Sequence, residues 1–149
     1  MAHTFTNLHS HLIFSTKDRL PSITPELKPR LHAYMGGIIR SLHGIPLAID
    51  GPADHVHLLI KTPATASIAD VLRVLKTNSS KWVHETFPHS EFAWQTGYGA
   101  FSVSYSAVDS VRKYIASQEE HHKQVSFQEE FIAFLKRHGI EYDERYIWE

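Results

Sequence analysis

Four short stretches of the chain carry the apolar patterns of β-strands: one alternates loosely between apolar and polar residues, and three are short runs rich in apolar or aromatic residues. The first stretch alternates loosely, with Leu8, Leu12 and Phe14 set among polar neighbours. The turn sequence Gly-Pro-Ala-Asp at 51–54 separates the second stretch from the third, so these two are predicted to pair as an antiparallel hairpin. The four predicted strands cover residues 4–15, 45–50, 55–61 and 98–104.

Four other stretches repeat apolar residues at intervals of three and four, which predicts amphipathic helices. A residue suited to the N-cap precedes each one. The side-chain oxygen of such a residue can accept a hydrogen bond from a free N–H of the first helical turn. Gly44 and Gly139 are the expected ends of the first and the fourth helix. The four helices are predicted to begin at Thr24, Ser67, Ser106 and Ser126.

The order of these elements favours a ferredoxin-like α+β fold. Strand, helix, strand, strand, helix, strand is its β-α-β-β-α-β pattern, which RNA-recognition modules share. Two helices would cover one face of an antiparallel sheet, and the other face is open to a ligand, a partner or the two C-terminal helices. The chain has 149 residues, so residues 1–149 are expected to form one domain.

Composition narrows the chemistry. The chain has no cysteine, which excludes disulfides, thiolate metal sites and a cysteine nucleophile, and its 12 histidines make imidazoles the natural metal ligands. The net charge is only -1, but residues 1–118 hold 11 basic and 8 acidic residues while 119–149 hold 4 and 8. The body of the chain is thus mildly basic. No signal peptide or stretch of ~18 apolar residues is present, so a soluble, cytoplasmic protein without membrane contact is expected.

Two His-x-His pairs stand on predicted strands. His55 and His57 would share one face, about 6.6 Å apart along the strand, and could converge on one cation. His9 and His11 have the same spacing on the first strand. The spacing alone leaves both pairs open as metal ligands, and polar surface is the alternative for each.

Tyr114 and Gln118 are four residues apart on the third predicted helix and therefore share a face. The apolar stripe of that helix runs largely along another face, so Tyr114 is not simple core filling; a half-buried tyrosine with its hydroxyl at the surface is the alternative. His121 and His122 follow at the next turn.

Together these motifs resemble the HUH-superfamily single-tyrosine transposases of bacterial insertion sequences and their REP-associated relatives. The resemblance covers most of the chain and follows four segments in order: HLIFSTKDR at 11–19, DHVHLLI at 54–60, WQTGYGAFSVS at 94–104 and YIASQEEHH at 114–122. It favours His55 and His57 over His9 and His11 as the ligand pair.

The resemblance implies a bacterial DNA transposase. His55, His57 and Gln118 would hold a divalent cation, Mg²⁺ or Mn²⁺, and Tyr114 would attack single-stranded DNA to give a covalent 5′-phosphotyrosine and a free 3′-hydroxyl. The C-terminal helices would thus carry the nucleophile. The resemblance further implies DNA ends that bear hairpins and a homodimer, and it leaves open whether Tyr114 serves its own chain or a partner's.

Single-strand binders combine basic grooves with aromatic platforms. Trp82 lies on an apolar helix stripe and is expected in the core, whereas Arg112 and Lys113 adjoin the nucleophile. The candidate DNA contacts are Lys76, Lys81, Trp94, Arg112 and Lys113.

Two other functions remain open on the sequence. One is a non-catalytic or domesticated single-stranded nucleic-acid-binding module of RRM-like fold. The other is a metal-dependent phosphodiesterase that releases its product to water.

Overall fold

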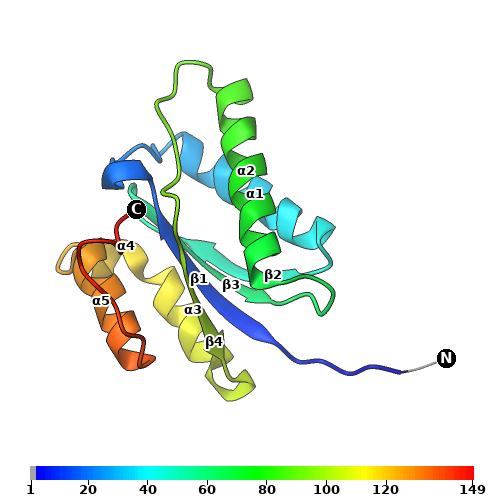
Figure 1. The fold of residues 1–149 in the computed structure, drawn as a ribbon. Coiled ribbons are helices and arrows are strands. Elements are labelled where there is room, and N and C mark those ends of the chain that lie inside the picture. The colour runs from blue at the N-terminus through cyan, green and yellow to red at the C-terminus, as the bar shows by residue number, and fades with distance from the viewer. Residues whose placement is uncertain (1–2) are drawn as a thin grey trace.

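A computed structural model describes residues 3–149 and contains one antiparallel sheet with strand order β2-β3-β1-β4 (Figure 1). The strands are β1 (His9–Ser15), β2 (Ile45–Asp50), β3 (His55–Lys61) and β4 (Gly99–Val103). The helices are α1 (Leu27–Ser41), α2 (Ile68–Thr86), α3 (Val108–Ala116), α4 (Gln118–His121) and α5 (Phe127–Arg137), with 3₁₀ turns at Lys17–Arg19 and Tyr105–Ala107. The predicted α+β, ferredoxin-like fold is confirmed.

Helices α1 and α2 cover one face of the sheet, and α3, α4 and α5 lie on the other (Figure 1). Successive side chains of a strand point to opposite faces. Leu12 and Phe14 of β1 therefore join the core beneath α1 and α2, while Ile13 between them packs against Phe131 and Phe134 of α5. No helix within residues 3–149 is both long and apolar enough to cross a bilayer.

Strand β3 lies between β1 and β2 and is buried from His55 to Ile60. Val56, Leu58 and Ile60 fill the core on the α1–α2 side. His55 and His57 alternate with these core residues along the strand, so they point to the opposite face of the sheet, toward α3, α4 and α5. The alternation of the strand thus places the two histidines under the C-terminal helices.

The first predicted strand is too long. Residues 4–8 stay outside β1, and Phe5 is 92% exposed. Strand β1 begins at His9 because the neighbouring strands end there: His9 pairs with Lys61 at the end of β3 and with Val103 at the end of β4. Residues before His9 have no strand beside them to complete a ladder.

Two of the four predicted helix starts are confirmed: Ser67 Oγ accepts the N–H of Asp70, and Ser126 Oγ accepts that of Glu129. Thr24 Oγ1 accepts the N–H of Leu27, but α1 begins only at Leu27 with Glu26 as its N-cap, so Thr24 lies before the helix. Ser106 is wrong as a cap: it lies inside a 3₁₀ turn, its Oγ is 3.2 Å from Ser104 Oγ, and α3 begins only at Val108.

Two further details of the helices differ from expectation. The third helix breaks at Ser117, so Tyr114 lies on α3 while Gln118 begins α4. The left-handed residue after α1 is His43 (φ 68°), not Gly44. A Cβ at Gly44 would lie 3.1 Å from the Lys61 carbonyl oxygen, so glycine is needed there for close approach to β3. Gly139 (φ 66°) does follow α5 as expected.

Replacement of Phe14 by alanine should lower the free energy of unfolding by about 3–5 kcal/mol, because the side chain is fully buried and the change leaves a cavity. Urea unfolding would measure the loss. Phe5→Ala is the matched control, with an expected effect within about 0.5 kcal/mol. Equal effects of the two changes would contradict the described position of β1.

Candidate metal and tyrosine site

The histidines of the motif on β3 lie side by side and have no exposed surface. The ring centroids of His55 and His57 are 5.1 Å apart. Phe127 at the start of α5 packs over His55 with a centroid separation of 4.6 Å. The pair is therefore enclosed between the sheet and α5.

Glu130 of α5 meets these histidines from the opposite side. Its Oε1 lies 2.9 Å from His57 Nε2, 3.0 Å from His122 Nε2 and 3.3 Å from His55 Nε2. One ligand atom from each of the four residues falls within a span of 4.8 Å. Imidazole nitrogens and a carboxylate at this spacing could hold a divalent metal ion.

The charges in this cluster depend on each other. Burial alone would raise the pKa of Glu130, but the surrounding imidazoles of His122, His55 and His57 hold this pKa well below its usual range. Burial lowers the pKa of His57 to about 4 despite the nearby carboxylate. For His55 the balance is reversed: burial opposes the charged form, but Asp54 and Glu130 raise its pKa above the ordinary value. The cluster therefore combines an ionised carboxylate with imidazoles of unequal basicity.

Tyr114 of α3 brings its hydroxyl to the same carboxylate. The hydroxyl donates a hydrogen bond to Glu130 Oε2 and lies 3.4 Å from His121 Nε2. The Tyr114 and His57 rings are 5.8 Å apart. Burial and the Glu130 carboxylate raise the pKa of Tyr114, while Gln118 and Arg137 act in the opposite direction.

Gln118 is fully buried at the start of α4. Its Nε2 donates to the Tyr114 carbonyl at 3.2 Å, whereas its Oε1 has no hydrogen-bond partner among the described residues. His55 Nε2 likewise makes no hydrogen bond of good geometry there. A buried acceptor without a partner, such as Gln118 Oε1, is costly in a protein interior, and a bound cation would satisfy it. The residues present therefore fit a metal.

Sequence reasoning missed Glu130. A signal was available: Glu130 stands three residues after Phe127 and four before Phe134, inside the apolar stripe of α5. An acidic residue at a core position needs a partner, and here the partners are imidazoles. His122 was recognised only as a neighbour of the site, and it lies among the four possible ligands.

The candidate DNA contacts fall into two groups. Lys76 donates to the Thr96 and Gly97 carbonyls, and Trp94 Nε1 donates to Ser79 Oγ, so both are engaged on the α1–α2 side of the sheet. Lys81 is exposed on α2, with Nζ 3.9 Å from Glu85 Oε1. By contrast, Arg112 and Lys113 are exposed on α3 and directly precede Tyr114 in the sequence. Only this second group adjoins the tyrosine.

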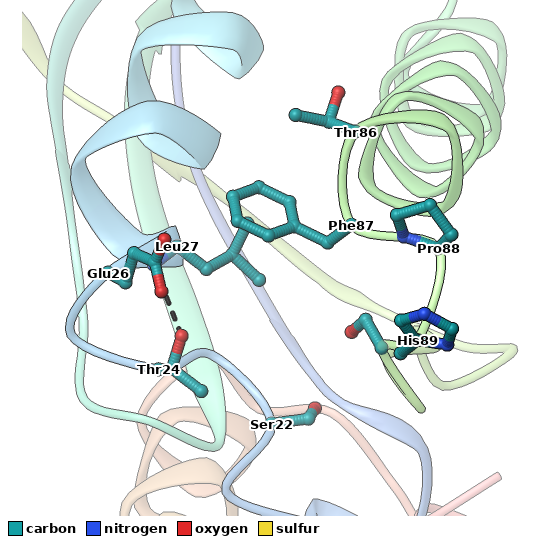
Figure 2. Close-up of a pocket in the computed structure, with 9 residues that line it drawn as sticks. Ser22, Thr24, Glu26, Leu27, Thr86, Phe87, Pro88 and His89 are labelled. Carbon is teal, nitrogen blue, oxygen red and sulfur yellow. Dashed lines mark hydrogen bonds between the residues drawn. The ribbon is translucent and has the colours of Figure 1, made fainter.

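Two hollows differ in their relation to the site. A pocket of about 400 Å³ lies between the start of α1 and the end of α2, where Phe87 extends toward Leu27 (Figure 2); none of the cluster residues lines it. A smaller cleft of about 150 Å³ opens beside Tyr114. Its lining residues are His11, Ser110, Val111, Tyr114, Phe134 and Arg137. The smaller cleft is thus the one next to the tyrosine hydroxyl.

With this geometry established, comparison with known proteins identifies the family. The sequence profile of IS200-like transposases matches residues 4–118, which is most of the chain. The chain belongs to the IS200-like transposase family. The resemblance seen in the sequence motifs is thereby confirmed.

Individual relatives agree with this membership. The transposases of insertion sequence element IS200 from Salmonella typhimurium and Salmonella typhi are each 26% identical over 129 residues, which is 83% of this chain and 84% of theirs. A crystal structure assigned as a transposase from Deinococcus radiodurans R1 has a TM-score of 0.64 at 25% identity, over 79% of this chain and 95% of that one.

A second solved structure, a REP-associated tyrosine transposase bound to a REP hairpin, has a TM-score of 0.62 over 84% of this chain and 74% of that one. At 12% identity this likeness concerns the fold alone.

Lowering the pH from about 6.5 to 4 should destabilise the metal-free protein. Burial lowers the pKa of His11 to about 3, and those of His57 and His32 to about 4. In the unfolded chain these imidazoles take up protons near pH 6.5, so falling pH favours unfolding by up to about 1.4 kcal/mol per pH unit for each. His55, whose pKa is raised, does not add to this slope, because its contribution is fully present below pH 6.5 and is lost only as the pH rises above that value.

Urea unfolding in the presence of a chelator, at half-unit steps of pH, would measure this slope. A free energy of unfolding that stays constant or increases down to pH 4 would contradict the burial of neutral imidazoles.

Proposed function

We propose that this transposase cleaves and rejoins single-stranded DNA by a metal-dependent transesterification in which Tyr114 is the nucleophile. The observation that carries the proposal is the meeting of two features on one carboxylate. Glu130 accepts the Tyr114 hydroxyl through one oxygen and faces the motif imidazoles through the other. A nucleophile and a candidate metal site thus share one buried group.

The metal would be held by His55, His57 and Gln118, with His122 and Glu130 as further donors. Two motif imidazoles and the unpaired amide oxygen are neutral, so they leave the positive charge of the cation available to a phosphate. A histidine-rich set with one carboxylate suits Mn²⁺ at least as well as Mg²⁺. When bound, the ion would supply Lewis-acid polarisation of the scissile phosphate.

The chain's own groups account for the covalent step. Tyr114 Oη attacks the phosphorus, the bond from phosphorus to the 3′-oxygen breaks, and a 5′-phosphotyrosine and a 3′-hydroxyl result. Glu130 Oε2 already accepts a hydrogen bond from the phenol, whose proton must leave Oη as the new bond forms. Because one phosphoester replaces another, the reverse attack by a 3′-hydroxyl rejoins the strand without ATP.

Single-stranded DNA would approach through the cleft beside Tyr114. Arg137 lines this cleft, and Arg112 and Lys113 are exposed on the helix that carries the tyrosine. These three cations provide phosphate contacts close to the nucleophile. The fold likeness to a REP-associated transposase bound to a hairpin supports DNA ends with hairpins as the substrate. The protein would act in the bacterial cytoplasm.

We further propose a homodimer in which each tyrosine serves its own chain. The homodimer is what the sequence resemblance implies, and the assignment of each tyrosine to its own chain is supported by the contact of Tyr114 with Glu130, which faces His55 and His57. Mixing a Tyr114→Phe chain with a His57→Ala chain tests this arrangement. Complementary activity in the mixture would overturn it in favour of exchange between subunits.

Tyr114→Phe should abolish a denaturant-resistant protein–DNA adduct, because the attacking oxygen is gone. The assay is incubation of single-stranded DNA from the flanks of the gene with Mn²⁺, followed by denaturing electrophoresis. Tyr105→Phe is the matched control, since Tyr105 is 73% exposed and makes no contact with the cluster, and its adduct should match the wild type. Intact DNA binding by a wild-type protein that forms no adduct would favour a non-catalytic binding module. Cleavage without any adduct would favour a phosphodiesterase.

His57→Ala should abolish cleavage while leaving DNA binding within about threefold, because the change removes a metal ligand and no proposed DNA contact. His9→Ala, at the same spacing on the other His-x-His pair, should keep cleavage near wild type. Cleavage rate and fluorescence anisotropy of a labelled strand measure the two properties. Near wild-type cleavage by the His57 variant would refute the metal site, provided circular dichroism shows that it is folded.

A further inference from the structure

The first His-x-His pair has one member at the metal cluster. His11 lies on β1, is 2% exposed, and its Nε2 is 2.9 Å from His57 Nδ1. The two ring centroids are 5.1 Å apart with an interplanar angle of 32°. His11 also packs against Phe134 of α5 in an edge-on arrangement, with the two ring centroids 5.1 Å apart. A histidine 46 residues away in sequence thus reaches the far side of the His57 ring.

His57 is consequently held from both ends. Its Nε2 faces Glu130 and the cluster, while its Nδ1 faces His11. A neutral imidazole carries one proton on its two nitrogens, and a metal-binding nitrogen must offer its lone pair. If Nε2 binds the ion, Nδ1 carries the proton and becomes a buried donor that needs an acceptor. In the described structure, the atom within reach of Nδ1 is His11 Nε2.

His55 has an outer partner of another kind. Its Nδ1 lies 2.7 Å from Asp54 Oδ1, so an adjacent carboxylate performs the orienting task there. Metal-binding histidines generally donate their second N–H to such a partner, which fixes both ring orientation and tautomer. Among the side chains that the structure describes, no carboxylate faces His57 on that side, and a neighbouring strand supplies an imidazole instead.

We propose that His11 is a positioning residue of the metal centre: it accepts the Nδ1–H of His57 and thereby keeps the Nε2 lone pair directed at the metal. The inference rests on the metal site of the proposed function. It makes His11 a specific part of that site although it does not touch the ion. His9 shares the strand and the spacing but makes no such bond: its Nδ1 has no partner among the described residues.

Mn²⁺ affinity, measured by isothermal titration calorimetry on the full chain, tests the proposal. His11→Leu keeps the size of the side chain and removes the acceptor, so Kd should rise 10–100-fold. His11→Gln places an amide acceptor near the same position and should bind within about threefold of wild type. His9→Leu is the matched control and should bind as wild type. Unchanged Kd in a folded His11→Leu protein, or equal losses in the Leu and Gln variants, would overturn the proposal.

Nuclear magnetic resonance provides a readout that packing alone would not alter. Long-range ¹H–¹⁵N spectra of the protein saturated with Mg²⁺ should show His57 protonated at Nδ1 and His11 unprotonated at Nε2. A His57 ring unprotonated at Nδ1 would overturn the proposal. Failure of the transposase function is separable, because a protein that binds Mn²⁺ through these residues without cleaving DNA would refute the chemistry and leave the role of His11 intact.

Discussion

A single buried carboxylate ties the second layer of the molecule to the sheet. Glu130 on α5 faces His55 and His57 on β3 through one oxygen and Tyr114 on α3 through the other. A buried charge left without partners costs several kcal/mol, so each of these elements must take a position that satisfies it. The packing of the C-terminal helices is therefore set by one polar contact as much as by the phenylalanines of α5.

The sheet contributes rigidity to this arrangement. Strand β3 is central and bonded on both sides, so its side chains cannot shift without disturbing β1 and β2. The tyrosine, by contrast, lies on a nine-residue helix that ends at a break, and its ring is held by side-chain contacts with Glu130, Phe134 and neighbouring histidines rather than by a sheet. A firmly held group of ligands thus faces a nucleophile that stands on a more adjustable element.

The sequence predicted the order of elements, the sheet and the placement of His55 and His57 because these depend on local periodicity, which the chain displays clearly. It overextended β1, since the end of a strand depends on where its neighbours end. It also treated Tyr114 and Gln118 as members of one helix, although Ser117 interrupts it. The contacts of Glu130 and His11 with His57 could not be predicted, because the partners are 73 and 46 residues apart in sequence and no spacing rule reports such contacts.

The depth of the histidine pair has a kinetic meaning. His55 and His57 have no exposed surface, and the carboxylate above them is 3% exposed. An ion would enter or leave past His122, which lines an open pocket with Asp54 and Phe127, and outward movement of the segment that carries His122 and Glu130 would constitute a local opening of this route. Exchange of the ion is then governed by the frequency of that local opening, so the identity of the occupant reflects the metals present while the chain folds as well as equilibrium preference.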